Sequence, residues 1–483
     1  MGSIERQSLK RTMKSLDVVA LAFGTIIGWG WVILLGGWVS SAGVVGAVIA
    51  FVIGAVLCIF VGLTYAELTP ALPLAGGELV FAYRGLGYTP SWITGWMITF
   101  AYIGVAAFEG PSFSTALTNL IPVPKIAYLY TVAGFDIHLG WLLVGVAMAV
   151  ILTVVNILGI KSATIFQTGA TVLLCLGGLT LLFGSVTQGD ISNAAPAFTS
   201  FKGLAAVLLV VPAMFVGFDV IPQAAEEMNI ELKSIAKILI FSICLAALWY
   251  ILMILSLGFA APLEVREDAL AGTGSPAADA LEYVAGRVFS RILITAALIG
   301  ILTSWNGFIV GASRVLFSMA RAKMLPPVFG KLHPKYKTPT AAILLVGVIT
   351  VFAPFLGRSA LVWFIDASAF GTVVAYFMVA LSFIALRRNE PDLARPYKVK
   401  GGMTIGVLAV LVALFFLYLY LPVGPSPLTP IEWVLVLVWV ALGVVFYGMT
   451  RKQNRNVTSA EIEYMMFGDE YARKDRIKSG NIA

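Results

Sequence analysis

The run Gly24-Thr25-Ile26-Ile27-Gly28-Trp29-Gly30 lies at the centre of an apolar stretch, residues 17–39, that is long enough to cross a bilayer. The glycines predict that this helix is interrupted at mid-membrane depth. In hydrocarbon an unpaired backbone group costs several kcal/mol, so irregular backbone is tolerated there only where it lines a cavity or meets a ligand. A second break of the same character is predicted at Met214-Phe215-Val216-Gly217-Phe218-Asp219. Two broken helices in corresponding halves of a chain are typical of secondary transporters.

Composition places the chain in a lipid bilayer. Hydrophobic residues make up 59% of the 483 residues and charged residues 12%, and the mean hydropathy is +0.94, whereas soluble proteins carry about 25% charged residues. The sequence predicts an all-α integral membrane protein with about twelve transmembrane helices, and counts of eleven or thirteen remain open. Apolar windows of about 20 residues occur near 17–39, 43–68, 91–118, 140–159, 163–186, 203–227, 236–260, 288–320, 340–356, 360–386, 403–422 and 432–449.

The distribution of Lys and Arg predicts the orientation. Of the 32 basic residues, 26 lie near the termini and in the even-numbered loops, and six lie in the odd-numbered loops. The positive-inside rule therefore places both termini in the cytoplasm of a multi-pass protein of the cell membrane. The formal net charge of +7 reflects this orientation. No basic stretch carries the interleaved aromatic residues of a base-stacking surface, so no nucleic-acid partner is expected.

Motifs after the second span resemble those of a known family. The chain reads Tyr65-Ala66-Glu67-Leu68 and then Ala75-Gly76-Gly77-Glu78, a pattern that looks like the amino acid-polyamine-organocation (APC) permeases. Further matches follow in the family's order, at Asn156 to Lys161 with Gln167, at Phe215 to Asp219 with Glu226 and Glu227, and at Arg314 to Arg321 with Leu325 and Pro326. The resemblance implies the LeuT-type fold, in which two five-helix repeats of inverted topology precede two further helices.

An inverted repeat of five spans pairs span 1 with span 6, and these are the two spans with glycine breaks. Discontinuous helices 1 and 6 are therefore expected. The polar segment 261–287 is expected to face outward, and the tail is expected either to form a short helix around 460–466 or to stay disordered. The expected organisation is a cytoplasmic N-terminus at 1–16, a first repeat at 17–186, a second at 187–386, helices 11 and 12 at 387–450 and a cytoplasmic tail at 451–483.

The first break is a candidate substrate site. Unwinding exposes backbone amides at the positive end of a half helix, which favours an anion, and the resemblance implies an amino acid substrate with a carboxylate to place there. The residues expected to make this contact are Ile27, Gly28, Trp29 and Gly30. The alternative is that the glycines merely allow close helix packing. Trp29 departs from the family, which commonly has a small residue at this position, so substrate size cannot be transferred from relatives.

The second break supplies further candidates, namely Met214, Phe215, Gly217 and Phe218. An aromatic residue here resembles the lid that covers bound substrate in the family, and Phe215 is favoured over Met214 for that role. The alternative is an aromatic side chain in contact with lipid or core.

Three ionisable residues are candidates for proton coupling. A carboxylate such as Asp219 at mid-membrane is costly unless protonated or paired, and the family often uses an acid there in proton coupling. Glu109, late in span 3, either meets a substrate amine in the cavity or lies at the outer water interface. The resemblance implies that Lys161 reaches toward spans 1 and 8, where sodium-coupled relatives hold an ion; the alternative is a lysine that snorkels at the cytoplasmic edge.

Charged pairs near the end of spans 6 and 8, Glu226 and Glu227 with Arg314 and Arg321, are interpreted as exposed gate or anchoring charges, which add little stability. No phosphate-binding loop, nucleophile elbow or metal-ligand spacing occurs, so neither an enzyme nor a cofactor nor a metal site is expected. The predicted function is secondary active transport of an amino acid or related amine by alternating access, with proton-coupled symport. The alternatives are an exchanger of the same family or, further removed, a channel or a non-transporting membrane sensor.

Overall fold

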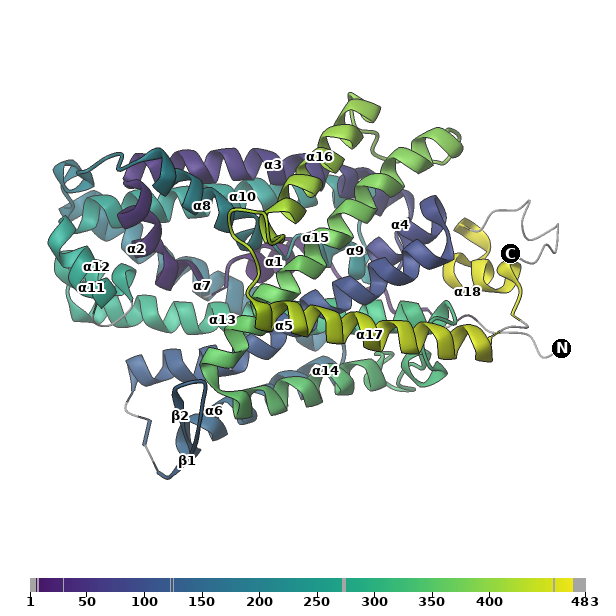
Figure 1. The fold of residues 1–483 in the computed structure, drawn as a ribbon, viewed down its shortest axis with the longest axis horizontal. Coiled ribbons are helices and arrows are strands. Elements are labelled where there is room, and N and C mark those ends of the chain that lie inside the picture. Colours follow the sequence, from purple (N-terminus) through teal and green to yellow (C-terminus); the bar gives the residue numbers. More distant parts are fainter. Residues whose placement is uncertain are drawn as a thin grey trace.

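The computed structural model describes residues 6, 8–28, 30–121, 123–124, 126–271, 275–454 and 457–471. It is a bundle of helices with one short hairpin (Figure 1). The elements are α1 Ser15–Ile26, α2 Gly30–Ala42, α3 Val44–Ala71, α4 Gly77–Leu86, α5 Tyr88–Leu120, β1 Tyr128–Val132, β2 Phe135–His138, α6 Leu139–Ile157, α7 Ile160–Gln188, η1 Ile191–Ala194, α8 Phe201–Met214, α9 Val220–Gln223, η2 Ala225–Glu227, α10 Leu232–Ala260, α11 Leu263–Ala271, α12 Pro276–Ala285, α13 Arg287–Arg321, η3 Pro327–Gly330, α14 Thr340–Phe352, η4 Ala353–Leu356, α15 Gly357–Asn389, α16 Gly402–Tyr420, α17 Pro430–Gln453 and α18 Ser459–Tyr471.

The helices confirm an all-α membrane protein. Within the described residues, nine helices are long and apolar enough to cross a membrane, and α1 with α2, bent by 51° at their break, makes a tenth span. α8 and the segment Thr340–Leu356 are shorter apolar helices. Each of the twelve apolar windows falls on a helix or on a broken helix. The count of twelve crossings, the inverted repeat and the repeat boundaries remain predictions.

Local sequence signals explain several helix ends. α17 begins where the Thr429 backbone N–H donates to Glu432 at 2.7 Å in a capping box, with Pro430 in the first turn. The hairpin turns at Ala133 and Gly134, which have φ of 49° and 75°; a two-residue turn of this kind matches the twist of its strands. α18 covers the stretch where a short tail helix was one of the two expectations.

Three helices and two strands have no counterpart in the sequence analysis: α4, the strands β1 and β2 of the hairpin, and the pair α11 and α12 within the polar segment. They are short, so their apolar residues form no window of bilayer length. Residues 272–274 of the polar segment lie outside the described residues.

Arg6, the first described residue, and α18, the last described helix, lie together at one end of the molecule, which is called the terminal end below (Figure 1). The Arg6 side chain donates to the Met465 carbonyl of α18 at 3.3 Å. This contact requires the two ends to lie on the same side of a membrane, which agrees with an even number of crossings. Along the flank, α17 leaves large apolar side chains exposed, among them Leu437, Val444 and Val445, which suits contact with lipid.

Candidate functional site

The first predicted break is present between α1 and α2. α1 ends at Ile26 and α2 begins at Gly30. The Ile27 N–H donates to the Phe23 carbonyl at 2.8 Å, and the Gly28 N–H donates to the Ile26 carbonyl at 3.2 Å. The first N–H groups of α2 have no partner within the helix and form its positive end. The break therefore offers amide donors to an anion. Trp29, also predicted for this site, lies outside the described residues.

The second break lies between α8, which ends at Met214, and α9, which begins at Val220. Gly217 has φ of 130°, a conformation that only glycine adopts without strain. A Cβ built on Gly217 would lie 2.8 Å from the Ile26 nitrogen and 2.9 Å from the Thr25 carbonyl carbon. The two breaks are thus in direct backbone contact, and the absence of a side chain at Gly217 permits it.

Tyr250 of α10 connects the two breaks, a role that sequence analysis missed. Its hydroxyl lies 2.9 Å from the Met214 carbonyl, where α8 ends, and 3.2 Å from the Ile26 carbonyl, where α1 ends. The residue is buried. A lone tyrosine in an apolar span carries no sequence signal for such a contact, because the contact depends on how α10 is rotated.

Replacing Tyr250 with phenylalanine keeps the ring and removes the hydroxyl. Neutral hydrogen bonds contribute about 0.5–1.5 kcal/mol each, so we expect thermal unfolding of the purified protein to occur at a lower temperature and substrate affinity to fall. Tyr283→Phe is the matched control, because Tyr283 is exposed on α12. Equal effects of the two substitutions on affinity would show that Tyr250 has no special place at the breaks.

The candidate side chains of the second break lie in two different environments. Phe215 is fully buried and packs on Tyr250, with ring centroids 5.8 Å apart. Met214 faces the first break, because its sulfur and methyl carbon lie 3.7 Å from the position of a Cβ on Gly30. Phe218 instead stacks on Tyr376 of α15 at 5.5 Å. Phe215 and Met214 therefore lie between the breaks, whereas Phe218 packs against the neighbouring helices.

Glu109 of α5 lies beside the first break and is buried among protein side chains. A Cβ on Gly28 would lie 3.9 Å from the Glu109 carboxylate oxygen Oε1 and 3.3 Å from the Ser304 hydroxyl of α13. The backbone at Gly28 thus faces a carboxylate and a hydroxyl from two other helices.

Asp219 lies directly after the second break and is fully buried. Its Oδ2 accepts a hydrogen bond from the Tyr102 hydroxyl at 2.8 Å, and its Oδ1 accepts one from the Gly217 N–H at 2.7 Å. In the part of the chain that the structure describes, no Lys, Arg or His forms an ion pair with Asp219 or Glu109. Both are therefore buried acids without a compensating cation.

The position of Lys161 agrees with the second of its two expectations, a lysine at the edge of the bundle. Lys161 is the second residue of α7, and its side chain is exposed. The polar contacts from α7 to α1 and α13 come from Gln167, which accepts from Asn306 at 2.7 Å and donates to the Ala20 carbonyl at 3.3 Å. The physical reason is helix geometry: Gln167 lies six residues, or nearly two turns, further along α7, deeper in the bundle.

The charged pairs at the terminal end are buried, which corrects the expectation of exposed pairs. Arg314 binds Glu227 at 2.7 Å with both side chains about 1% exposed, and Arg321 binds Glu226 at 2.9 Å. Burial opposes ionisation of Glu226, but the charge and hydrogen bonds of Arg321, with the charge of Arg6, lower its pKa to about 2. Breaking a buried pair is far more costly than breaking an exposed one, so these contacts fasten η2 to α13 at the terminal end.

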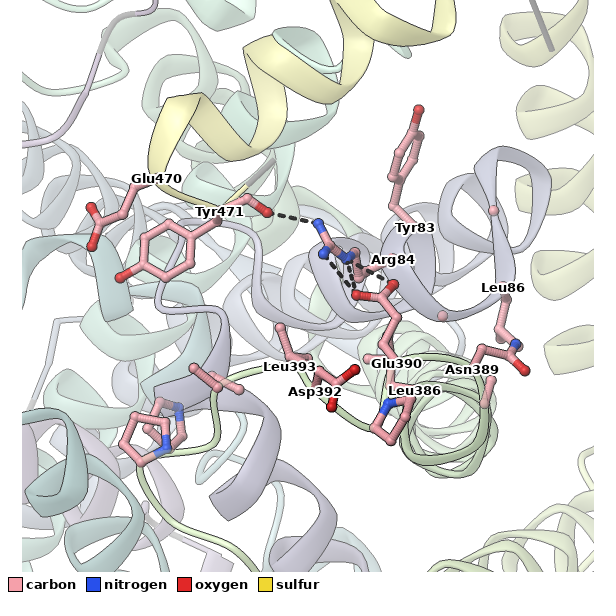
Figure 2. A pocket seen from close by; sticks show the side chains of 18 of the residues that line it. Tyr83, Arg84, Leu86, Leu386, Asn389, Glu390, Asp392, Leu393, Glu470 and Tyr471 are labelled. Atoms are coloured by element: carbon pink, nitrogen blue, oxygen red, sulfur yellow. Dashed lines mark hydrogen bonds and ion pairs between the residues drawn. The ribbon is translucent and has the colours of Figure 1, made fainter. Parts of the chain in front are cut away.

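A cavity of about 1170 Å³ also lies at the terminal end, between α4, α15 and α18. Figure 2 shows Arg84 among its lining residues, reaching the Glu390 carboxylate, at 2.7 Å, and the Tyr471 carbonyl, also at 2.7 Å. None of the candidate substrate or coupling residues lines this cavity. It is therefore separate from the site at the helix breaks.

Comparison with known proteins gives a family match over most of the chain. Residues 14–446 match the model of the family described as amino acid permease. A branched-chain amino acid permease of Bacillus subtilis is 29% identical over 93% of this chain and 95% of its own length. A methylthioribose transporter of the same organism is 25% identical over 91% and 93% of the two chains, and its aspartate-proton symporter is 24% identical over 85% and 79%.

Proposed function

Because the chain belongs to the amino acid permease family, we propose that it is a secondary active transporter that binds an amino acid or a related amine where its two broken helices meet. The observation that carries this proposal is the direct contact of the two breaks, at Gly217 against Thr25 and Ile26. Irregular backbone inside a membrane protein is expected only where it lines a cavity or a binding site. Transporters place their substrate at such paired breaks.

The ends of the half helices suit both charges of an amino acid. The positive end of α2, at Gly30, would hold the carboxylate, with the backbone at Ile27 and Gly28 beside it. The carbonyl ends of α1 and α8, at Ile26 and Met214, would face the amine. Phe215 would cover the bound substrate. Phe218, which packs on Tyr376, is left out of the proposed contacts.

Transport would follow alternating access with proton coupling. The buried ion pairs Glu227–Arg314 and Glu226–Arg321 close the terminal end, while Gly28, Gly30 and Met214 keep partial exposure at the breaks. Asp219 is the proposed proton site at the second break, because it is buried, forms no ion pair with any described residue and receives a hydrogen bond from the break itself. Glu109 is the second proposed site. Lys161 is exposed and has no part in the proposal.

Both termini are proposed to lie in the cytoplasm. The contact of Arg6 with α18 supports a position of both ends on one side of the membrane, and the excess of Lys and Arg in the loops of that side supports the cytoplasmic side. The chain would then span the cell membrane several times, with its C-terminal helix on the inner face.

The proposal is tested by thermal unfolding of the purified protein in the presence of each common amino acid and of its decarboxylated analogue. A ligand at 100 times its dissociation constant stabilises by about 2.7 kcal/mol. We expect one amino acid, or a small related set, to raise the unfolding temperature. If decarboxylated analogues stabilise equally, the carboxylate contact at α2 is wrong, and if no amino acid or amine stabilises the protein, the substrate class is wrong.

A further inference from the structure

Glu78 is a second buried acid close to Asp219, on a helix that crosses no membrane. It lies in the first turn of α4, which begins after Gly76 and has ten residues. A Cβ built on Gly77 would lie 2.8 Å from Pro222 and 3.2 Å from the Gln223 nitrogen of α9. This close approach presses the start of α4 against α9 and brings the fully buried Glu78 carboxyl to Gln223.

The polar atoms around Glu78 are incompletely satisfied. The Gln223 side-chain amide donates to Glu78 Oε2, but Glu78 Oε1 and Gln223 Oε1 have no hydrogen-bond partner among the described residues. The Tyr65 hydroxyl lies beside the carboxyl without a hydrogen bond of normal geometry. An unpartnered buried oxygen is costly for a carboxylate, and less so for a carboxylic acid, whose proton can occupy that side.

Among the residues that the structure describes, no Lys, Arg or His forms an ion pair with Glu78. The titratable groups that face it are Tyr65 of α3, Tyr102 of α5, Asp219 before α9 and Tyr376 of α15; α13 contributes the hydroxyl of Ser318, next to Gly76. Arg84, on α4 itself, is bound to Glu390 and to the Tyr471 carbonyl (Figure 2). The neighbourhood of Glu78 is thus acidic and phenolic.

Two buried carboxylates in one such neighbourhood cannot both be ionised at low cost. Asp219 accepts two hydrogen bonds, from Tyr102 and from the Gly217 N–H, and these stabilise its charged form. Among the described residues, Glu78 accepts one hydrogen bond of normal angle, from Gln223 to Oε2, and its Oε1 accepts none, although the Tyr65 hydroxyl lies beside the carboxyl. Burial, and then the charge of Asp219, raise the pKa of Glu78 well above its usual range. The hydrogen-bond pattern therefore assigns the proton to Glu78 and the charge to Asp219.

We propose that Glu78 and Asp219 form one shared proton-binding site, in which Glu78 holds the proton while the terminal end is closed. The role of this site in transport rests on the proposed function. The site connects the second break to the terminal end, because Gly217 and Asp219 belong to the break and Glu78 belongs to α4. Movement of α9 away from α4 would expose Glu78 Oε1 to water and let the proton leave as the site opens.

The placement of the proton is tested without transport, by infrared spectroscopy of the purified protein near neutral pH. The C=O stretch of a protonated buried carboxyl is separate from carboxylate bands. We expect Glu78→Gln to remove part of this band and Asp219→Asn to leave that part in place. A Glu78→Gln spectrum with the full wild-type band would overturn the proposal. If Glu78→Gln does not fold, the Glu109→Gln protein is prepared with isotope-labelled glutamate carboxyl groups instead. The label lowers the C=O stretching frequency of any protonated glutamate. A carboxyl band that does not shift on labelling contains no protonated Glu78 and would overturn the proposal.

The role in coupling is tested in proteoliposomes with the same variant. Glu78→Gln should still exchange labelled for unlabelled substrate, but its uptake should no longer respond to an inward proton gradient. A retained gradient response in Glu78→Gln would overturn the coupling role. If the wild type itself ignores the gradient, the proton coupling of the proposed function fails, while the infrared band still decides where the proton lies.

Discussion

Replacing Gly217 with alanine is expected to abolish substrate binding and to reduce uptake in proteoliposomes to the level of empty vesicles. Two effects act together. A residue with a Cβ at φ of 130° is strained by about 1–3 kcal/mol, and the added carbon would lie 2.8 Å from the Ile26 nitrogen, where the obstacle is backbone and cannot rotate away. The two breaks must then separate, and the geometry that we propose for the substrate site is lost.

The matched control is Gly37→Ala in α2. Gly37 lies in the same broken span, but a Cβ there meets no atom within 4 Å, so wild-type uptake and binding are expected. Both variants are compared by the stabilisation that the substrate gives in thermal unfolding. Wild-type substrate affinity in Gly217→Ala would mean that the contact between the breaks is unimportant for binding. That result would contradict the proposed substrate site.

Asp219→Asn is expected to lose accumulation driven by an inward proton gradient while retaining exchange of labelled for unlabelled substrate. The amide can still accept the hydrogen bond from the Tyr102 hydroxyl, so the fold around α9 should persist. It cannot exchange a proton with Glu78, so the proposed shared site can no longer load and release its proton during the transport cycle. The measurement is the ratio of uptake with and without the gradient, which should fall to about one.

Lys161→Ala serves as the comparison for Asp219→Asn, because Lys161 was a sequence candidate for the same role and proves to be exposed. We expect the gradient response of Lys161→Ala to match that of the wild type. The opposite pattern, with a response kept by Asp219→Asn and lost by Lys161→Ala, would restore the lysine as the coupling group and remove Asp219.

The positions of the spans and of both breaks could be predicted from the sequence, because they depend on local properties. Long apolar windows report burial in lipid, and glycines at Gly28 and Gly217 report backbone that departs from a helix. Those signals are read along the chain and need no knowledge of neighbouring helices. The resemblance to a known family also rested on local motifs, such as Ala75 to Glu78, and the family match over residues 14–446 confirms it.

Contacts between helices could not be predicted in the same way. Tyr250 connects the first break to α10, and Gln167 connects α1 to α7, but the direction of each side chain depends on the rotation of its helix about the helix axis. Lys161 matched a motif and still faces outward, because a position near a helix start leaves the side chain at the rim of the bundle. The burial of Glu227 and Arg314 likewise follows from packing, since isolated charges near a span end suggest a solvated surface.

The most direct test of the central claim is uptake of a labelled amino acid, chosen from the thermal screen, into proteoliposomes that contain the wild-type protein. We predict accumulation that requires an inward proton gradient, that is unchanged when sodium is replaced by potassium or choline, and that is absent from empty vesicles. Uptake that depends strictly on sodium, or that occurs only when the vesicles are preloaded with substrate, would contradict proton-coupled symport, and the absence of any amino acid or amine uptake would contradict the proposed transport function itself.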